Sequence, residues 1–238
     1  MDNAEIVIYR PYGRALGDCW LVLNYYIGLA NETSKRVYLS DHYLKKTKLR
    51  LASKLYEILP LLNYKKELFE LCQWEPTELK INWTLLAKYP VVPSHILWKK
   101  NHSKKICYQF DAKSQWRARF SSPEIEQKVL FHAESLGYTV TKLGLPTPLK
   151  NCLEDLAESE LFLGVDSGMC NAAAACGIPI LFCRNTESIS KWDILHRNKH
   201  FILTNDYIEL INEISNYNKH GLDYYIHNIK NKEYCKWL

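Results

Sequence analysis

A short turn in the carboxyl half of the chain, Asp166-Ser167-Gly168, carries residues suited to binding phosphate. The two polar residues can cap a helix, and the glycine lets a backbone come close to a ligand. The apolar run 161–165 predicts a buried strand, and the small residues 169–176 predict a close-packed helix that ends at Gly177. Such a turn directs N–H groups and a positive dipole end toward the carboxyl edge of a sheet. An ordinary βαβ turn without a ligand has the same pattern, so both interpretations stay open.

A carboxylate in the amino half is the second candidate for chemistry. Asp18 follows the predicted strand 5–10 and a loop with two glycines, and it begins a predicted buried helix, 19–30. At the open end of a sheet, a carboxylate can take a proton from a hydroxyl group. A carboxylate at a helix start also serves as a simple cap, so the sequence leaves both roles open.

Two groups of cations could meet an anionic ligand. The loop 111–119 follows the predicted strand 105–110 and contributes Lys113, Arg117 and Arg119. A basic helical face in 43–62 consists of Lys45, Lys46, Lys48 and Arg50. Since most basic helical faces only interact with water, we favour the loop cations as ligand-binding residues.

The remaining pattern alternates strands with helices. Further strands are predicted at 36–40, 79–83, 138–143, 178–183 and 200–203, and further helices at 43–62, 65–74, 122–136, 149–158, 206–217 and 224–237. This alternation predicts an α/β protein with parallel sheets covered by helices on both faces. The segment 90–102 has the proline and lysine content of a linker, which divides the chain into two lobes.

Composition narrows the protein class. The 238 residues are 47% hydrophobic, which is enough for one large or two small cores. The net charge of +5 fits an anionic ligand but is too weak to indicate a nucleic-acid partner. The eight cysteines form no CxxC pair, and no spacing indicates a metal site. Free thiols, the absence of a basic-then-apolar leader and the absence of an apolar run of about 20 residues predict a cytoplasmic protein without a membrane span. A peripheral membrane contact stays open.

Three segments resemble the heptosyltransferases, glycosyltransferases of the GT-B fold. The segment 10–18, RPYGRALGD, is similar to their glycine-rich amino-terminal loop, and 161–182, LFLGVDSGMCNAAAACGIPILF, is similar to their carboxyl-domain signature. The segment 184–192 resembles their nucleotide-side loop, with an acidic residue and a tryptophan at similar spacing. The resemblance implies two Rossmann-like lobes: an acceptor-side lobe, 1–95, and a nucleotide-sugar-binding lobe, 104–220. It also implies a closing helix, 221–238, that packs back on the amino lobe.

The resemblance also implies roles for single residues. Asp18 corresponds to the acid thought to act as general base. The residues implied in binding substrate or nucleotide are Gly13, Arg14, Gly17, Lys113, Arg117, Arg119, Asp166, Ser167, Gly168, Asn171 and Glu187. The implied activity is metal-independent transfer of a sugar from a nucleotide-diphosphate sugar to a hydroxyl acceptor, by default a bacterial surface glycan such as lipopolysaccharide or capsule, without a separate cofactor.

Two departures from the family support an alternative. The family has a histidine where this chain has Asn171, and asparagine cannot hold a proton. The amino half is also short for the fold. The alternative is a degenerate GT-B protein that binds a nucleotide or nucleotide sugar without turnover. A nucleotide-sugar hydrolase or epimerase is a third interpretation.

Overall fold

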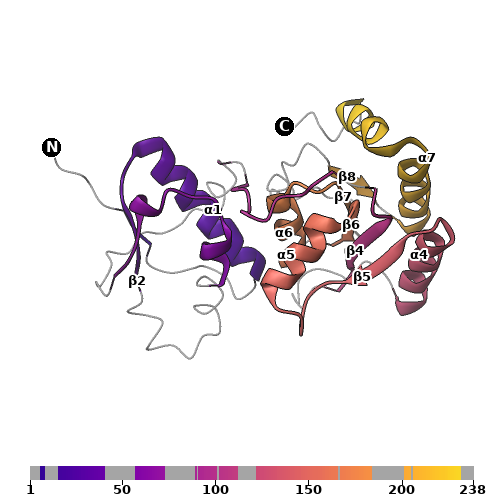
Figure 1. The fold of residues 1–238 in the computed structure, drawn as a ribbon, viewed down its shortest axis with the longest axis horizontal. Coiled ribbons are helices and arrows are strands. Elements are labelled where there is room, and N and C mark those ends of the chain that lie inside the picture. Colours follow the sequence, from indigo (N-terminus) through magenta and orange to yellow (C-terminus); the bar gives the residue numbers. More distant parts are fainter. Residues whose placement is uncertain are drawn as a thin grey trace. The chain divides into compact units, whose positions relative to one another are not determined.

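The chain forms two compact units, each built on its own parallel sheet (Figure 1). The computed structural model describes residues 6–8, 16–40, 57–72, 89, 91–100, 102–111, 122–165, 167–183, 201–204 and 206–231. The amino unit spans 1–92 and the carboxyl unit 93–238. Every described strand pairs in parallel with its neighbours. The predicted α/β class, with two lobes of parallel sheet, is confirmed.

The amino unit has a three-stranded sheet in the order β1-β2-β3. Its strands are β1 (Ile6–Ile8), β2 (Val37–Ser40) and β3 (Phe69–Cys72). Helix α1 (Leu16–Thr33) connects the first two strands and supplies most of the described core of this unit. Its buried side chains include Cys19, Trp20, Val22, Leu23, Tyr26, Ile27 and Ala30.

Helix α1 begins earlier than the sequence predicted. Leu16 and Gly17 form its first two positions, so Gly17 lies in the first turn and not in the preceding loop. Asp18 is the third residue of the helix and not the residue before it. A glycine is tolerated there because the N–H groups of a first turn have no acceptor inside the helix.

The predicted helix 65–74 is wrong. The chain makes a 3-10 turn, η2 (Lys66–Leu68), and then β3, in which Leu71 lies opposite Leu39 of β2. Lysine, glutamate and leucine favour a helix locally, but pairing along β2 decides the conformation of this short segment. Of the predicted helix 43–62, only the end is described, where helical residues 57–58 lead into η1 (Leu59–Leu61). The predicted strand 79–83 lies outside the described residues.

The carboxyl unit has a five-stranded sheet in the order β5-β4-β6-β7-β8. The strands are β4 (Lys105–Gln109), β5 (Thr139–Lys142), β6 (Leu161–Gly164), β7 (Ile180–Cys183) and β8 (Phe201–Thr204). Every residue of β6 and β7 is buried, as expected for central strands covered on both faces. The sequence predicted all five strands, with ends within about two residues.

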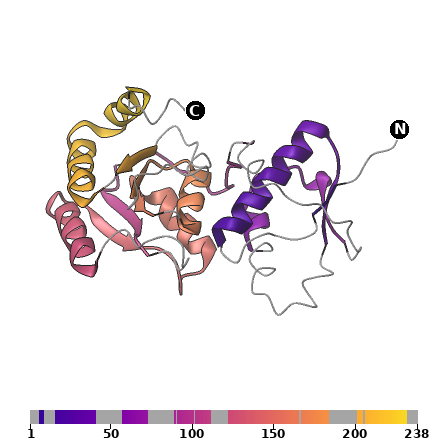
Figure 2. The ribbon, with the colours of Figure 1, turned by 180° about the vertical axis from the view of Figure 1, so that it is seen from behind.

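Four helices cover this sheet. Helices α4 (Pro123–Ser135) and α7 (Tyr207–Asn231) lie on one face, and α5 (Leu149–Glu158) and α6 (Gly168–Cys176) lie on the other (Figures 1 and 2). Helix α7 is interrupted at Gly221, whose φ of 70° is left-handed, so its two parts follow the predicted helices 206–217 and 224–237. Residues 232–238 are outside the described part, and packing of the closing helix on the amino lobe stays a prediction.

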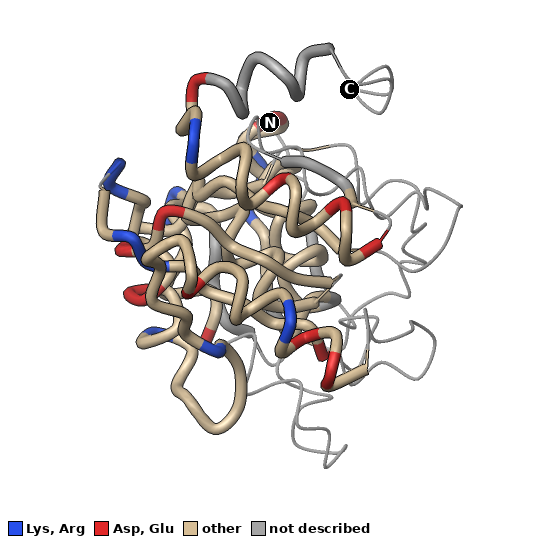
Figure 3. Tube along the Cα trace, turned by 90° about the vertical axis from the view of Figure 1, so that its right-hand side faces the viewer, with Lys and Arg blue, Asp and Glu red and all other residues tan. Residues whose placement is uncertain are grey.

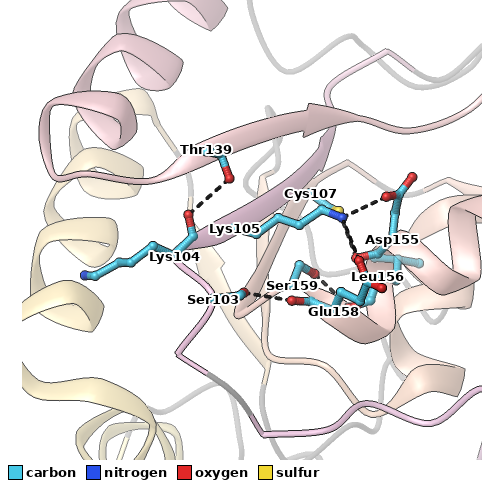
Figure 4. A network of polar contacts seen from close by, with 9 residues as sticks. All are labelled: Ser103, Lys104, Lys105, Cys107, Thr139, Asp155, Leu156, Glu158 and Ser159. Carbon is cyan, nitrogen blue, oxygen red and sulfur yellow. Dashed lines mark hydrogen bonds and ion pairs between the residues drawn. The ribbon is translucent and has the colours of Figure 1, made fainter.

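A polar network fastens the amino end of β4 to the end of α5 (Figure 4). The Lys105 ammonium lies 2.7 Å from a carboxylate oxygen of Asp155 and 3.4 Å from one of Glu158. Burial alone would lower the pKa of Lys105, but the hydrogen bond and charge of Asp155 raise it. The charges of Lys105, Asp155 and Glu158 are paired with one another at the amino edge of the sheet, so we interpret this network as structural.

Candidate functional site

The strand order places a topological switch point between β4 and β6. From β4 the chain moves outward to β5 on one side, then continues on the other side through β6, β7 and β8. In open α/β sheets, ligands bind outside the carboxyl ends of the strands at such a point. Gln109 and Gly164 are the last residues of the two strands and lie opposite each other in the register. The candidate site is therefore this edge of the carboxyl unit.

The two strands approach each other closely because position 164 is a glycine. The Val165 N–H donates to the Gln109 carbonyl at 3.1 Å and continues the pairing beyond the strands. A Cβ atom on Gly164 would lie 2.9 Å from that same carbonyl oxygen and 2.6 Å from the Phe162 ring. Both distances are shorter than real Cβ contacts, so any larger residue would push β4 and β6 apart.

Ser167 and Gly168 form the start of α6, directly after β6. The Ser167 hydroxyl accepts a hydrogen bond from the Cys170 N–H at 3.2 Å, which makes Ser167 the N-cap. The N–H groups of Gly168 and Met169 belong to the first turn and have no acceptor inside the helix. Residues 169–176 are all buried, so α6 is held rigidly with this turn at the carboxyl edge. Such a turn can bind a phosphate group.

Asn171 lies one turn into α6 and is 4% exposed. Its side-chain amide donates to the Ser167 carbonyl at 3.2 Å, and its backbone N–H donates to the same oxygen at 3.3 Å. The side chain therefore supports the turn from inside the helix. Nothing in this arrangement supplies an acid or a base.

A described cation, Lys142, lies at this edge of the sheet. Lys142 ends β5, and its ammonium is 3.4 Å from a carboxylate oxygen of Asp111, which follows β4. Both side chains are about half exposed, so the pair is open to solvent and to an anionic ligand. Elsewhere on the described carboxyl unit, basic and acidic residues are interspersed (Figure 3). The sequence analysis missed Lys142, because only strand order shows that β5 ends beside β4.

Several predicted site residues lie outside the described residues. They are Gly13, Arg14, Lys113, Arg117, Arg119, Asp166 and Glu187. Of the others, Ser167, Gly168 and Asn171 meet at the start of α6, while Gly17 and Asp18 lie in the first turn of α1. The loops that would carry Lys113, Arg117 and Asp166 follow β4 and β6, the two strands at the switch point.

Comparisons with known proteins identify structural neighbours only. No family model matches the sequence, and no curated protein is significantly similar to it. The chain is similar to the crystal structure of TibC, a dodecameric iron-containing heptosyltransferase in complex with ADP-D-β-D-heptose. The TM-score is 0.61 with 11% identity, and the match covers 93% of this chain and 78% of that one. A second structure is the iron-containing dodecameric glycosyltransferase TibC from enterotoxigenic E. coli H10407, with a TM-score of 0.54 and 14% identity. That match covers 75% of this chain and 59% of that one.

The fold is of the GT-B type. Two parallel-sheet units occur in one chain, and the structural match extends over nearly all of it. The resemblance to heptosyltransferases predicted from three sequence segments is thus confirmed at the level of fold. At 11–14% identity, this structural similarity establishes the fold of the chain and does not establish its substrate.

The iron of these GT-B neighbours has no counterpart in the described part of this chain. No three His, Cys, Asp or Glu side chains come together there in a way that could hold a metal ion. Burial raises the pKa of the Cys107 and Cys176 thiols to about 12, and it also raises that of Cys183. Over the described helices, none is long and apolar enough to cross a membrane.

Proposed function

We propose that this protein is a glycosyltransferase that moves a sugar from a nucleotide-diphosphate sugar to a hydroxyl acceptor. The observation that carries the proposal is the turn at Ser167-Gly168. It lies at the switch point of a sheet whose fold is shared with a heptosyltransferase in complex with ADP-heptose. Position and chemistry agree, because the switch point is where such sheets bind ligands and the turn offers N–H groups to phosphate.

The donor diphosphate binds at this turn in the proposed reaction. Negative charge grows on the leaving diphosphate during transfer, and fixed N–H groups and cations stabilise it. The candidate cations are Lys113, Arg117, Arg119 and the newly located Lys142. Asn171 supports the turn through the Ser167 carbonyl, and we assign Asp166 to phosphate binding and Glu187 to nucleotide binding by the resemblance to the heptosyltransferases. ADP-heptose is the first donor to test because the neighbouring structure contains it.

Asp18 is the proposed general base. Its position in the first turn of α1 is close in sequence to Gly13, Arg14 and Gly17, which we assign to the acceptor side. The mechanism requires the Asp18 carboxylate to reach the acceptor hydroxyl while that hydroxyl faces the anomeric carbon of the donor. We propose a bacterial surface glycan as acceptor and the cytoplasm as the place of reaction.

We also propose that transfer needs no metal ion. Fixed N–H groups and cations can stabilise the charge of the leaving group without a metal ion. Purified protein should keep its activity after treatment with EDTA and dialysis. Elemental analysis that finds iron in stoichiometric amount, together with loss of activity on its removal, would contradict this part of the proposal.

A nucleotide-release assay tests the proposed function. The protein is incubated with ADP-, GDP-, UDP- and CMP-linked sugars, with and without glycan acceptors, and free nucleotide is measured. Release that depends on the acceptor supports transfer, whereas release without an acceptor indicates a hydrolase. Absence of both binding and release across the panel contradicts the proposal.

The second candidate is a degenerate GT-B protein that binds a nucleotide sugar without turnover. The observation that favours it is Asn171, whose amide is used inside α6 and provides no proton at a position where the family has a histidine. Calorimetry separates the two candidates: nucleotide binding with no release under any acceptor condition supports the binding protein.

A further inference from the structure

One polar group at the switch point has no role in the fold. Gln109 is the last residue of β4, and its side-chain oxygen, Oε1, is buried without a hydrogen-bond partner. The described residues contain one other such buried side-chain atom, the indole Nε1 of Trp20 in the amino unit. A buried acceptor that gives up water without gaining a partner destabilises the free protein. Each such group in a folded protein therefore needs an explanation.

The surroundings of Gln109 leave room for this amide. Gly144 follows β5 with a left-handed φ of 110°, and a Cβ atom there would lie 2.9 Å from the Gln109 Nε2 atom. Gly164 lies on the other side, where a Cβ atom would lie 2.9 Å from the Gln109 carbonyl oxygen. The Leu143 N–H donates to the Tyr108 carbonyl at 2.9 Å and fixes the exit of β5 against β4. Glycine on both sides thus allows a long polar side chain at the centre of the edge.

Other buried amides in this protein have structural partners. The Asn24 amide donates to the Tyr89 carbonyl and its oxygen accepts from the Val92 N–H. The Asn171 amide donates to the Ser167 carbonyl. The Gln109 oxygen differs from both, because no donor among the described residues reaches it. Gln109 as a whole is partly exposed, so a rotation of its side chain would bring the oxygen to a ligand donor at the switch point, which would supply the missing hydrogen bond.

We propose that Gln109 is a specificity-determining residue whose side-chain oxygen accepts a hydrogen bond from a sugar hydroxyl of the nucleotide-sugar donor. This inference rests on the proposed function. An amide oxygen can only accept, so it recognises a hydroxyl and not a phosphate oxygen, which is itself an acceptor at neutral pH. Paired strands lie about 4.8 Å apart, so a diphosphate at the turn after β6 leaves an adjoining sugar within reach of the end of β4. The hydroxyl belongs either to the ribose or to the transferred sugar.

The test replaces Gln109 by methionine, which keeps the length of the side chain and removes the acceptor. The matched control is Gln127→Met on α4, where the glutamine is exposed. Without ligand, Gln109→Met should melt at the same or a higher temperature than wild type, since no hydrogen bond is lost. A melting temperature several degrees lower, with the control unchanged, would show that the amide has a structural partner and would overturn the proposal.

Calorimetry on the same two variants identifies the hydroxyl. The probes are ADP, GDP, UDP and CDP, the 2′-deoxy and 3′-deoxy forms of the tightest binder, and its sugar conjugate. For a probe that carries the recognised hydroxyl, we expect Gln109→Met to bind about 10-fold more weakly than wild type. For a probe that lacks this hydroxyl, the two proteins should bind with equal affinity. A loss already present with the diphosphate and absent with one deoxy form assigns the ribose. A loss seen with the sugar conjugate alone assigns the transferred sugar.

The outcomes separate this inference from the proposed function. If wild type binds a nucleotide and Gln109→Met binds every probe equally well, the proposed function stands and the role of Gln109 is refuted. If wild type binds no diphosphate and no sugar conjugate, the proposed function fails and the inference falls with it.

Discussion

Asp18 is the side chain on which the proposed chemistry depends. Asp18 is the third residue of α1, and negative charge in the first turn of a helix is generally favourable. We predict that Asp18→Asn lowers turnover about 100-fold or more, because asparagine has no basic oxygen at neutral pH. Loss of the charge near the helix start should cost about 1 kcal/mol of stability or less. Turnover, melting temperature and nucleotide affinity are measured on the same preparation.

Wild-type turnover in Asp18→Asn would remove Asp18 from the mechanism. Glu187 and Asp166 would then be the next carboxylates to test, and the binding-protein alternative would gain support. A large loss of stability with no change in turnover per folded molecule would assign Asp18 a structural role.

The buried thiols give a second prediction at this scale. Burial raises the pKa of Cys107 and Cys176 from an ordinary value near 9 to about 12. At pH 8 the reactive thiolate is then a fraction of about 10⁻⁴ of either group. Iodoacetamide at pH 8 should leave both cysteines unmodified in the native protein and modify both in guanidinium. Mass spectrometry of the digested protein reads the result, and rapid native labelling would contradict it.

The same thiols make stability depend on alkaline pH. A folded-state pKa above the unfolded value means that the unfolded protein releases its proton first as the pH rises. The folded state therefore keeps its full stability with respect to these two thiols below about pH 9. As the pH rises from about 9 to 12, deprotonation of the unfolded chain lowers the free energy of unfolding.

Chemistry-bearing residues were predictable from sequence only where they stand next to a glycine or a helix start. Ser167 and Gly168 carry such a signal. Gln109 and Lys142 do not, because an amide or a lysine at the end of a strand looks ordinary until the strand order is known. Their importance comes from β4 lying at the switch point with β5 as its other neighbour, which is a property of the folded sheet.

At the level of elements, the contact between β4 and β6 depends on Gly164. We predict that Gly164→Ala destabilises the protein by about 1–3 kcal/mol, the range for overpacking, because the added Cβ would overlap a backbone oxygen of β4. Gly177→Ala is the comparison: its φ of 82° is strained for alanine, yet nothing lies within 4 Å of the new atom. It should cost about 1–2 kcal/mol, and Gly177→Asn should cost less. Urea unfolding measures all three.

Equal stability of wild type and Gly164→Ala would show that the two strands can separate without cost. The close approach of Gln109 to β6 would then no longer be a constraint on the site.

The start of α6 carries the prediction about the nucleotide. Gly168 is the first residue of the helix, and Gly168→Val should place a branched side chain where the phosphates approach the backbone. We predict a loss of nucleotide affinity of at least about 10-fold with little change in the melting temperature, measured by calorimetry. Unchanged affinity would show that the phosphates bind elsewhere.

The elements that sequence analysis predicted well are those with a local signal of their own. Helix α5 has the predicted bounds, and α6 ends at the predicted glycine. The segment before β3 failed because Lys66, Glu67 and Leu68 favour a helix, whereas the conformation is set by pairing with β2, which is distant in sequence. Strands with an apolar run of their own, such as β6 and β7, were predictable, whereas β3 depends on pairing with β2.

At the scale of the molecule, the segment that joins the two units is fastened on both sides. In the amino unit, Asn24 holds Tyr89 and Val92 through its side-chain amide, and Gly28 leaves space for the Tyr89 ring. In the carboxyl unit, the N–H groups of Ser94 and Trp98 donate to the last carbonyls of α6, at 2.8 and 2.7 Å. The linker predicted from prolines and lysines is thus partly structured on each unit.

We predict that Asn24→Ala lowers the free energy of unfolding by about 1–3 kcal/mol, because it leaves the buried Val92 N–H without its acceptor. The matched control is Asn31→Ala, an exposed asparagine on the same helix, which should change stability by less than about 0.5 kcal/mol. Denaturant unfolding followed by fluorescence measures both. Equal effects of the two substitutions would contradict a fastening role for Asn24.

Pro93 stands in the chain between Val92, whose N–H donates to Asn24 of the amino unit, and Ser94, whose N–H donates to the Ala175 carbonyl of the carboxyl unit. Proline fixes its own φ, so the freedom of the connection reduces to a few rotatable bonds around it. A tether this short makes the encounter between donor-side and acceptor-side residues intramolecular, at an effective concentration set by geometry and not by protein concentration. In the proposed enzyme, turnover per molecule should therefore be independent of dilution.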